Sequence, residues 1–268
     1  MSEQPQIIHE QAGDVRIVTL NRPEKRNALT IEMVDQLADA VCGVDVEPDV
    51  RAVIVRGEGA LFSAGIDLMS LASARARAAG QHPGRWLRRM AEQMQNALNR
   101  LEATEVPVIG ALHGRVIGLG LEVALCFDLR VADEDTQLSI PETRLGLVAD
   151  VGGTTRLTRT IGPSRAKDML MTARDVDARE ALAWGLVNRV AETGGALAAA
   201  KELAGAIAKN APLAVGMAKL VIDQGDGLDR MTQMTLERWA QSQLVTTEDM
   251  AEAMTAFMEK RTPDFKGR

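Results

Sequence analysis

The sequence predicts an α/β protein whose C-terminal third is helical. Between Val15 and Asp133, short β-branched segments alternate with segments whose apolar residues recur at helical spacing. Strands that alternate with helices are typical of an α/β core. From Ser164 onward almost every segment has helical spacing, and 46% of all residues are apolar, which is ample for a buried core.

The elements follow in order along the chain. VRIVTLN and VRAVIVRG are rich in β-branched residues and predict strands at residues 15–21 and 50–57. Helical spacing predicts helices over residues 29–44 and 84–103, with a further helix that begins near Gly118. In the C-terminal part it predicts helices over residues 164–173, 177–186, 194–211, 212–225, 228–244 and 247–261.

No repeat, low-complexity tract or long linker divides the chain. We therefore expect one architecture with a core of residues 1–195 and a helical C-terminal subdomain of residues 196–268.

Composition excludes several classes of function. The net charge of −6 argues against a nucleic-acid or membrane partner recognised by overall charge. Cys42 and Cys126 lie in apolar surroundings without metal-ligand spacing, so we expect neither a disulfide framework nor a metal site, and a reducing cytoplasm is the default location. The first residues lack the pattern of a signal or transit peptide, and no apolar run has the length of a membrane helix.

Two loops have residues suited to turns and anion binding. NRPEKRNALT follows a predicted strand; it contains the cations Lys25 and Arg26, and Thr30 is placed to cap the next helix. In GEGALFSAGIDL, Gly65 permits backbone conformations that leave N–H groups free to bind an anion. Each loop alone is also explained as an ordinary turn.

The segment GRVIGLGLEVALCFDLRVAD contains one carboxylate, Glu122, in an apolar stretch. A buried carboxylate is costly unless it is paired, hydrogen-bonded or protonated, which makes Glu122 a candidate functional residue. A helix that begins near Gly118 offers free N–H donors for an oxyanion, and together with the Gly65 loop it would form an oxyanion hole. The competing dinucleotide-binding motif lacks its third glycine.

LSIPETRLGLVADVGGTTRL contributes two more acids. Pro141 favours an extended residue before it, which predicts Glu142 at a strand end or loop start. Asp150 comes just before a flexible glycine pair. Together with Glu122 these acids are candidates for paired acid and base chemistry, because neighbouring carboxylates separate each other's pKa values.

In their order and spacing these segments resemble the crotonase superfamily, the enoyl-CoA hydratase/isomerase family. The resemblance covers nearly the whole chain, from VRIVTLNRPEKRNAL through FSAGIDL and PETRLGLVADVGGTTRL to FMEKRTPDF. It implies a spiral of ββα units, with a helical C-terminal region that assembles homotrimers, often paired into hexamers. It also implies an acyl-CoA thioester substrate and no cofactor apart from that coenzyme A moiety.

Matching motif positions imply a role for particular residues. The backbone amides of Ile66 and Leu119 would hold the thioester oxygen, although many members have glycine at the Leu119 position. Residues that resemble the coenzyme A site are Lys25, Arg26, Ala28, Ala64, Gly65, Asp67, Leu68 and Gly118, with Phe257 and Lys260 reaching the coenzyme A of a neighbouring subunit.

The three acids leave two reactions open. Glu122 and Glu142 resemble the glutamate pair of the hydratases, which add water across a 2-trans double bond, and this is the function we expect. Asp150 instead resembles the aspartate of Δ3,5-Δ2,4-dienoyl-CoA isomerases, which would use it with Glu142. Those isomerases carry aspartate where this chain has Glu122, so the pattern is mixed.

A binding protein is the remaining alternative. SARARAAGQHPGRWLRRM is rich in arginine, and some relatives in the resembled family bind RNA. The patch is short, however, the chain is acidic overall, and Trp86 is its single aromatic residue. We therefore expect an enzyme rather than an RNA-binding or non-catalytic homologue.

Overall fold

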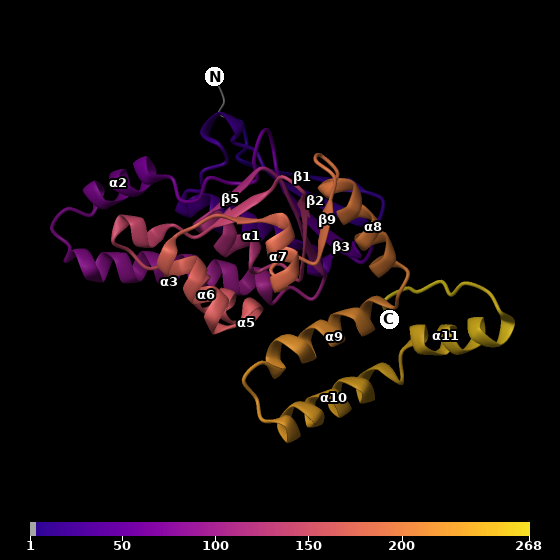
Figure 1. Ribbon diagram of the computed structural model, residues 1–268. Coiled ribbons are helices and arrows are strands. Elements are labelled where there is room, and N and C mark those ends of the chain that lie inside the picture. Colours follow the sequence, from indigo (N-terminus) through magenta and orange to yellow (C-terminus); the bar gives the residue numbers. More distant parts are fainter. Residues whose placement is uncertain (1–3) are drawn as a thin grey trace.

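The computed structural model describes residues 4–268 and confirms a mixed α/β body with a helical C-terminal part (Figure 1). The main sheet has six strands in the order β1-β2-β3-β4-β6-β9. β1 pairs antiparallel with β2, and every other pairing in this sheet is parallel. The strands are β1 Ile7–Ala12, β2 Val15–Leu20, β3 Ala52–Gly57, β4 Val108–Leu112, β6 Leu129–Asp133 and β9 Arg189–Ala191.

Both faces of the main sheet are covered by helices. On β2, Val18 and Leu20 belong to the core cluster that includes the buried faces of α1 (Ile31–Cys42) and α3 (Pro83–Glu102). Val15 and Ile17 belong to a separate cluster with α8 (Ala196–Ala208). Because successive side chains of a strand point to opposite faces, the β-branched runs can be buried on both sides.

A second, three-stranded sheet lies beside the first and positions the candidate acids. β5 (Arg115–Ile117) pairs parallel with β7 (Gln137–Ser139), which pairs antiparallel with β8 (Val176–Asp177). β5 leads into α4 (Leu119–Ala124), and β7 leads into the 3-10 helix η3 (Glu142–Leu145). The other helices of the body are α2 (Leu68–Arg77), α5 (Gly153–Ile161), α6 (Pro163–Thr172) and α7 (Ala178–Trp184), and short 3-10 helices cover Pro23–Lys25 and Gly43–Val46.

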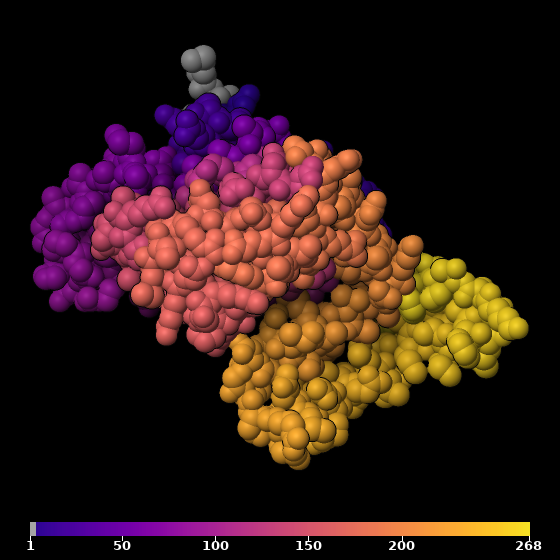
Figure 2. Space-filling view, in the orientation of Figure 1, coloured from indigo at the N-terminus to yellow at the C-terminus, as the bar shows by residue number. Residues whose placement is uncertain are grey.

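The last three helices project from the body. They are α9 (Pro212–Gly225), α10 (Arg230–Leu244) and α11 (Glu248–Glu259). In the space-filling view they form the yellow and orange extension on the lower right (Figure 2). Apolar side chains are exposed along this extension, among them Trp239, Met254 and Phe257. α8 packs on the sheet, and the division of the chain at residue 195 stays a prediction.

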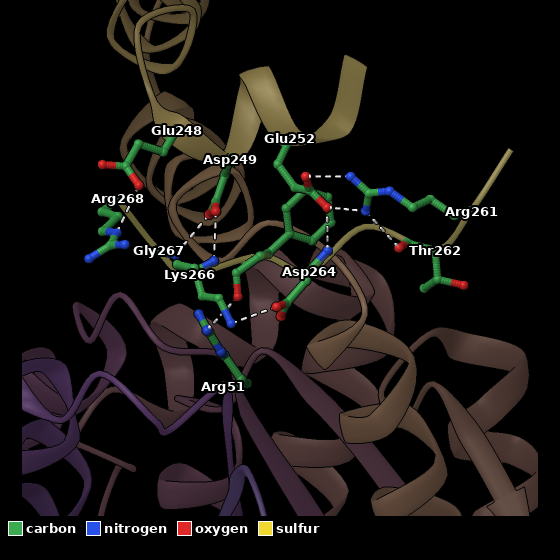
Figure 3. A network of polar contacts seen from close by, with 11 residues as sticks. Arg51, Glu248, Asp249, Glu252, Arg261, Thr262, Asp264, Lys266, Gly267 and Arg268 are labelled. Carbon is green, nitrogen blue, oxygen red and sulfur yellow. Dashed lines mark hydrogen bonds and ion pairs between the residues drawn. The ribbon is translucent and has the colours of Figure 1, made fainter. Parts of the chain in front are cut away.

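The C-terminal tail binds back to α11 and to the body (Figure 3). The carboxylate of Asp249, which is only 2% exposed, accepts hydrogen bonds from the backbone N–H groups of Lys266 (2.6 Å) and Gly267 (2.9 Å). Arg51, just before β3, donates to the carbonyl oxygen of Phe265 at 3.1 Å. The end of the chain therefore connects the N-terminus of α11 with the sheet.

Among residues 4–268, no single helix is both long and apolar enough to cross a membrane. α8 and α9 reach the required length and composition only as a pair, with a bend of 108° between them.

Candidate active site

Two loops that are far apart in the sequence lie against each other as short parallel segments. The N–H of Leu29 donates to the carbonyl of Gly65 (2.7 Å), and the N–H of Asp67 donates to the carbonyl of Leu29 (2.8 Å). Between these bonds, Leu29 and Ile66 form an isolated parallel bridge. The structure thereby brings the first loop and the Gly65 loop together, as their predicted shared role requires.

Gly65 is required by the close approach of this loop to the start of α4. Its φ is +89°, and an added Cβ would lie 2.7 Å from the carbonyl oxygen of Ile117 and 3.5 Å from the nitrogen of Leu119. The next residue, Ile66, is thus close to the first residue of α4. Neither the Ile66 N–H nor the Leu119 N–H has an acceptor among residues 4–268. Two free backbone donors at one place, one at a helix N-terminus, can bind an oxyanion.

Gly118 allows a carboxyl group to approach the N-terminus of α4. It has φ +51° and ψ −122°, and its N–H donates to the carbonyl of Ser139 at 2.8 Å. An added Cβ would lie 2.5 Å from Oε1 of Glu142. The Glu142 carboxyl group therefore lies against the backbone of residue 118, directly before the free N–H of Leu119.

Glu122 lies in the first turn of α4 and is only 3% exposed. Its Oε1 accepts hydrogen bonds from the backbone N–H groups of Val151 (3.0 Å) and Gly153 (2.8 Å), and no described residue donates to its Oε2. Burial raises the pKa of Glu122 to about 7; the bond from Gly153 opposes this rise, and the negative charge of Glu142 adds to it. Glu122 is thus held in place through one oxygen and can exchange a proton near neutral pH through the other.

Glu142 is half-buried and begins η3, in agreement with the predicted loop start after a strand. Its Oε2 is buried and has no hydrogen-bond partner within residues 4–268. Burial raises the pKa of the Glu142 carboxyl group, and the negative charge of Asp150 raises it further. A buried, unpaired carboxyl oxygen is costly when charged, so these surroundings make Glu142 a weaker acid than an ordinary glutamate.

Asp150 lies on the turn before α5. The backbone N–H groups of the nearby residues Val151 and Gly153 bind Glu122. The Asp150 side chain is exposed, partial burial raises its pKa, and the Asp150 carbonyl accepts a hydrogen bond from Gln95 at 2.5 Å. Ala149, Asp150 and Gly152 line one side of a cavity of about 1010 Å³ between α3, α5 and α9. Neither Glu122 nor Glu142 lines this cavity. Glu122, Glu142 and the two free amides of Ile66 and Leu119 lie around the start of α4, and we place the candidate active site there.

The structure brings some of the predicted coenzyme A residues together and leaves others apart. Ala64 joins the first loop, because its N–H donates to the carbonyl of Arg26 at 3.0 Å. Lys25 and the Arg26 side chain are exposed on that loop. Leu68, 56% exposed, begins α2.

Phe257 and Lys260 are exposed at the end of α11, which lies on the opposite side of the molecule from α2 (Figure 1). Within one chain α11 projects away from the body that contains Glu122 and Glu142.

Sequence reasoning missed residues that hold these loops in shape. Asn27 is fully buried at φ +49° and donates through Nδ2 to the carbonyls of Glu58 (2.8 Å) and Leu61 (2.9 Å). The Ser63 hydroxyl donates to the Asn27 carbonyl (2.8 Å) and accepts from the Gly65 N–H (3.1 Å). Asn27 is recognisable as a turn residue, but its partners across the two loops are not.

No metal centre is formed by the side chains described. Among residues 4–268, no group of three or more His, Cys, Asp or Glu residues is arranged to hold a metal ion.

Comparison with known proteins identifies the family. Residues 10–268 match the family described as enoyl-CoA hydratase/isomerase. The chain is 36% identical to the short-chain-enoyl-CoA hydratase of Clostridium acetobutylicum, over 98% of each chain, and 35% identical to the crotonyl-CoA hydratase of Syntrophomonas wolfei, over 97% of each. A crystal structure of enoyl-CoA hydratase from Bacillus anthracis superposes with a TM-score of 0.91 at 33% identity, and the match covers 98% of this chain and all of that one. The chain therefore belongs to the enoyl-CoA hydratase/isomerase family.

Proposed function

We propose that this protein adds water across the 2-trans double bond of an enoyl-CoA thioester. The observation that carries the proposal is the arrangement around the start of α4. The free N–H of Leu119 lies near that of Ile66, the Glu142 carboxyl group lies against Gly118, and Glu122 is in the first turn of α4. The names of the similar hydratases from Clostridium acetobutylicum and Syntrophomonas wolfei support the same reaction.

The two amides would polarise the thioester carbonyl. Hydrogen bonds from the N–H groups of Ile66 and Leu119 to the thioester oxygen stabilise the negative charge that develops there, and the loss of one such donor costs about 3 kcal/mol of transition-state stabilisation. Polarisation makes the β-carbon electrophilic, because the π electrons of the double bond can move towards the thioester oxygen.

The two glutamates divide the proton transfers. Glu122 accepts a proton from water through its free Oε2 while the water oxygen bonds to the β-carbon. The resulting enolate regains the thioester carbonyl as the α-carbon takes a proton from Glu142, whose pKa is raised by burial. The product carries the hydroxyl group of the water and the proton from Glu142, and transfer of the water-derived proton from Glu122 to Glu142 resets the pair.

Binding of the coenzyme A moiety is assigned to the two joined loops. Lys25, Arg26 and Ala28 of the first loop and Ala64, Gly65, Asp67 and Leu68 of the second would line it, and Gly118 would border the thioester. Lys25 and Arg26 offer positive charge to its phosphates. We propose no further cofactor.

Self-association would complete the coenzyme A site. Phe257 and Lys260 are exposed on the projecting helices, apart from the glutamates of the same chain. We therefore assign them to the coenzyme A of a neighbouring copy in a homotrimer, or in a hexamer of two trimers. The exposed apolar side chains on α10 and α11 support this assignment, because large exposed apolar surfaces mark protein interfaces.

Double-bond isomerisation is the second candidate function. It is favoured by Asp150, a third acid on the turn that holds Glu122, whose pKa is raised by partial burial. With Glu142, it would move a proton along a 3,5-dienoyl chain to give the 2,4-diene.

One experiment separates the two reactions. The purified protein is incubated with crotonyl-CoA and, separately, with a 3,5-dienoyl-CoA, and the absorbances of the enoyl thioester and of the conjugated diene are followed. We expect loss of the enoyl absorbance with crotonyl-CoA. Diene formation without any hydration would replace the proposed function by isomerisation, and turnover of neither substrate would reject both.

A further inference from the structure

We propose that Arg22 is a positioning residue that, with Asp67, fixes the backbone N–H of Ile66 for the thioester oxygen. Its guanidinium group spans the two loops of the site: Nη1 donates to the carbonyl of Ala28 at 2.7 Å, and Nη2 donates to Oδ2 of Asp67 at 3.0 Å. Both charged side chains are only 14% exposed. The inference rests on the proposed function, since it assigns a purpose to the Ile66 amide.

Asp67 connects this ion pair to α2. Its Oδ1 accepts the backbone N–H groups of Met69 (3.1 Å) and Ser70 (3.0 Å), so it caps the helix with one oxygen and binds Arg22 with the other. The bond from Ser70, with the Arg22 bond and charge, lowers the pKa of Asp67 against the opposing effect of burial. The carboxylate therefore stays charged, and both of its oxygens have partners.

The two contacts of Arg22 enclose Ile66. Ala28 is joined to Leu29, whose N–H and carbonyl bind Gly65 and Asp67, the residues on either side of Ile66. Arg22 thus binds both segments that form the Leu29–Ile66 bridge, through the residue before Leu29 on one segment and the residue after Ile66 on the other. Its own backbone is fixed as well, because its N–H donates to Oδ1 of Asn27 at 2.9 Å. A planar guanidinium group can bind a carbonyl and a carboxylate at once in fixed directions, which a lysine cannot do.

This arrangement has a catalytic consequence beyond stability. The Ile66 N–H has no acceptor in the described chain, so no bond of its own fixes its direction. Its position depends on the neighbouring residues, which are held by Leu29 and by the ion pair. A displacement of about 1 Å in a reacting geometry can lower a rate by about 100-fold. Loss of Arg22 should therefore act on the transition state more than on substrate binding.

The test compares Arg22→Gln and Arg22→Lys with a matched control. Arg16→Gln is suitable, because the Arg16 side chain is 12% exposed, pairs with Glu47 and lies near the opposite end of β2. Asp67→Asn is the second variant, since asparagine keeps the helix cap but loses the charge. Each protein is assayed for kcat and KM with crotonyl-CoA, for its melting temperature, and for the absorbance shift of bound cinnamoyl-CoA, which reports carbonyl polarisation.

We expect Arg22→Gln to lower kcat by roughly 10- to 100-fold with KM nearly unchanged, and to reduce the absorbance shift of bound cinnamoyl-CoA. Arg22→Lys should recover part of both losses, Asp67→Asn should resemble Arg22→Gln, and Arg16→Gln should match the wild type in both. The proposal is overturned if the two Arg22 variants keep the wild-type kcat and absorbance shift, whatever their melting temperatures. If Arg22→Gln does not fold, the same criteria apply to Arg22→Lys and Asp67→Asn.

Hydrogen exchange separates this proposal from the proposed function. Mass spectrometry of peptides that contain the Leu29 and Asp67 amides should show faster exchange in Arg22→Gln than in Arg16→Gln, because those amides form the bridge. This measurement needs no substrate. A wild-type protein that fails to hydrate crotonyl-CoA would refute the function alone, whereas unchanged exchange in Arg22→Gln would refute the loop connection itself.

Discussion

Replacement of Glu122 by glutamine should remove the activity and, near pH 8, should also stabilise the folded protein. The carboxyl group is 3% exposed, and burial raises its pKa from 4.5 to about 7. The folded protein therefore holds this proton more tightly than the unfolded chain does. The contribution of Glu122 to stability is fully present below pH 4.5 and is lost as pH rises to about 7.

The size of the effect follows from the two pKa values. A change from 4.5 to about 7 corresponds to about 3 kcal/mol in the free energy of unfolding. Glutamine is neutral at every pH and can still accept the N–H groups of Val151 and Gly153 through its side-chain oxygen. Glu122→Gln should therefore be more stable than the wild type by about 3 kcal/mol near pH 8, and the difference should vanish towards pH 4.5.

The assay is urea denaturation of both proteins at a series of pH values. Protein concentration is held constant, because self-association would add to the apparent stability. Glu134→Gln, a change on an exposed glutamate, is the control and should show no such pH-dependent gain. If Glu122→Gln is less stable than the wild type at pH 8, or if its gain is the same at every pH, the reasoning about its burial is wrong.

Three further predictions concern the other residues of the site. Glu142→Gln should lower kcat for crotonyl-CoA by roughly 100- to 10,000-fold while calorimetric binding of the product thioester is largely kept, because it removes the proposed acid; an unchanged kcat would exclude Glu142 from proton transfer. Asp150→Gly should leave hydration intact or improve it, and loss of the only measurable activity would instead support isomerisation. Gly118→Ala should abolish hydration, because its Cβ would lie 2.5 Å from Oε1 of Glu142 at a φ of +51°; steady-state rates near those of the wild type would show that Glu142 need not approach the helix.

Local sequence signals were sufficient for most of the helices and, among the described strands, for β2 and β3 alone. β2 and β3 lie within the segments predicted from β-branched residues, and α1 begins after Thr30, whose hydroxyl accepts the N–H of Met33 at 3.2 Å as a cap. β1 was not predicted, because its residues 7–12 are largely exposed at the sheet edge and lack the apolar alternation of a half-buried strand. The strands of the second sheet are too short to give a periodic signal.

The site was predictable as residues but not as a geometry. Family resemblance pointed to Glu122 and Glu142. The unpaired Oε2 of Glu142 and the hydrogen bonds from backbone N–H groups to Glu122, however, depend on loops that meet only in the folded chain. Asp67 was predicted only as a coenzyme A residue, and its ion pair with Arg22 gave no signal, because an ion pair between distant loops has no sequence period. Pairings of this kind are decided by tertiary structure.

The way Glu122 is held bears on how the chemistry of this protein can evolve. The main-chain N–H groups of Val151 and Gly153 fix the carboxylate, so the anchor does not use the side chain of residue 150. Asp150 lies on the turn before α5 with its side chain exposed. Selection can therefore exchange residue 150 in a single mutational step while Glu122 keeps its position, which opens a route from one reaction to another that need not pass through an inactive intermediate.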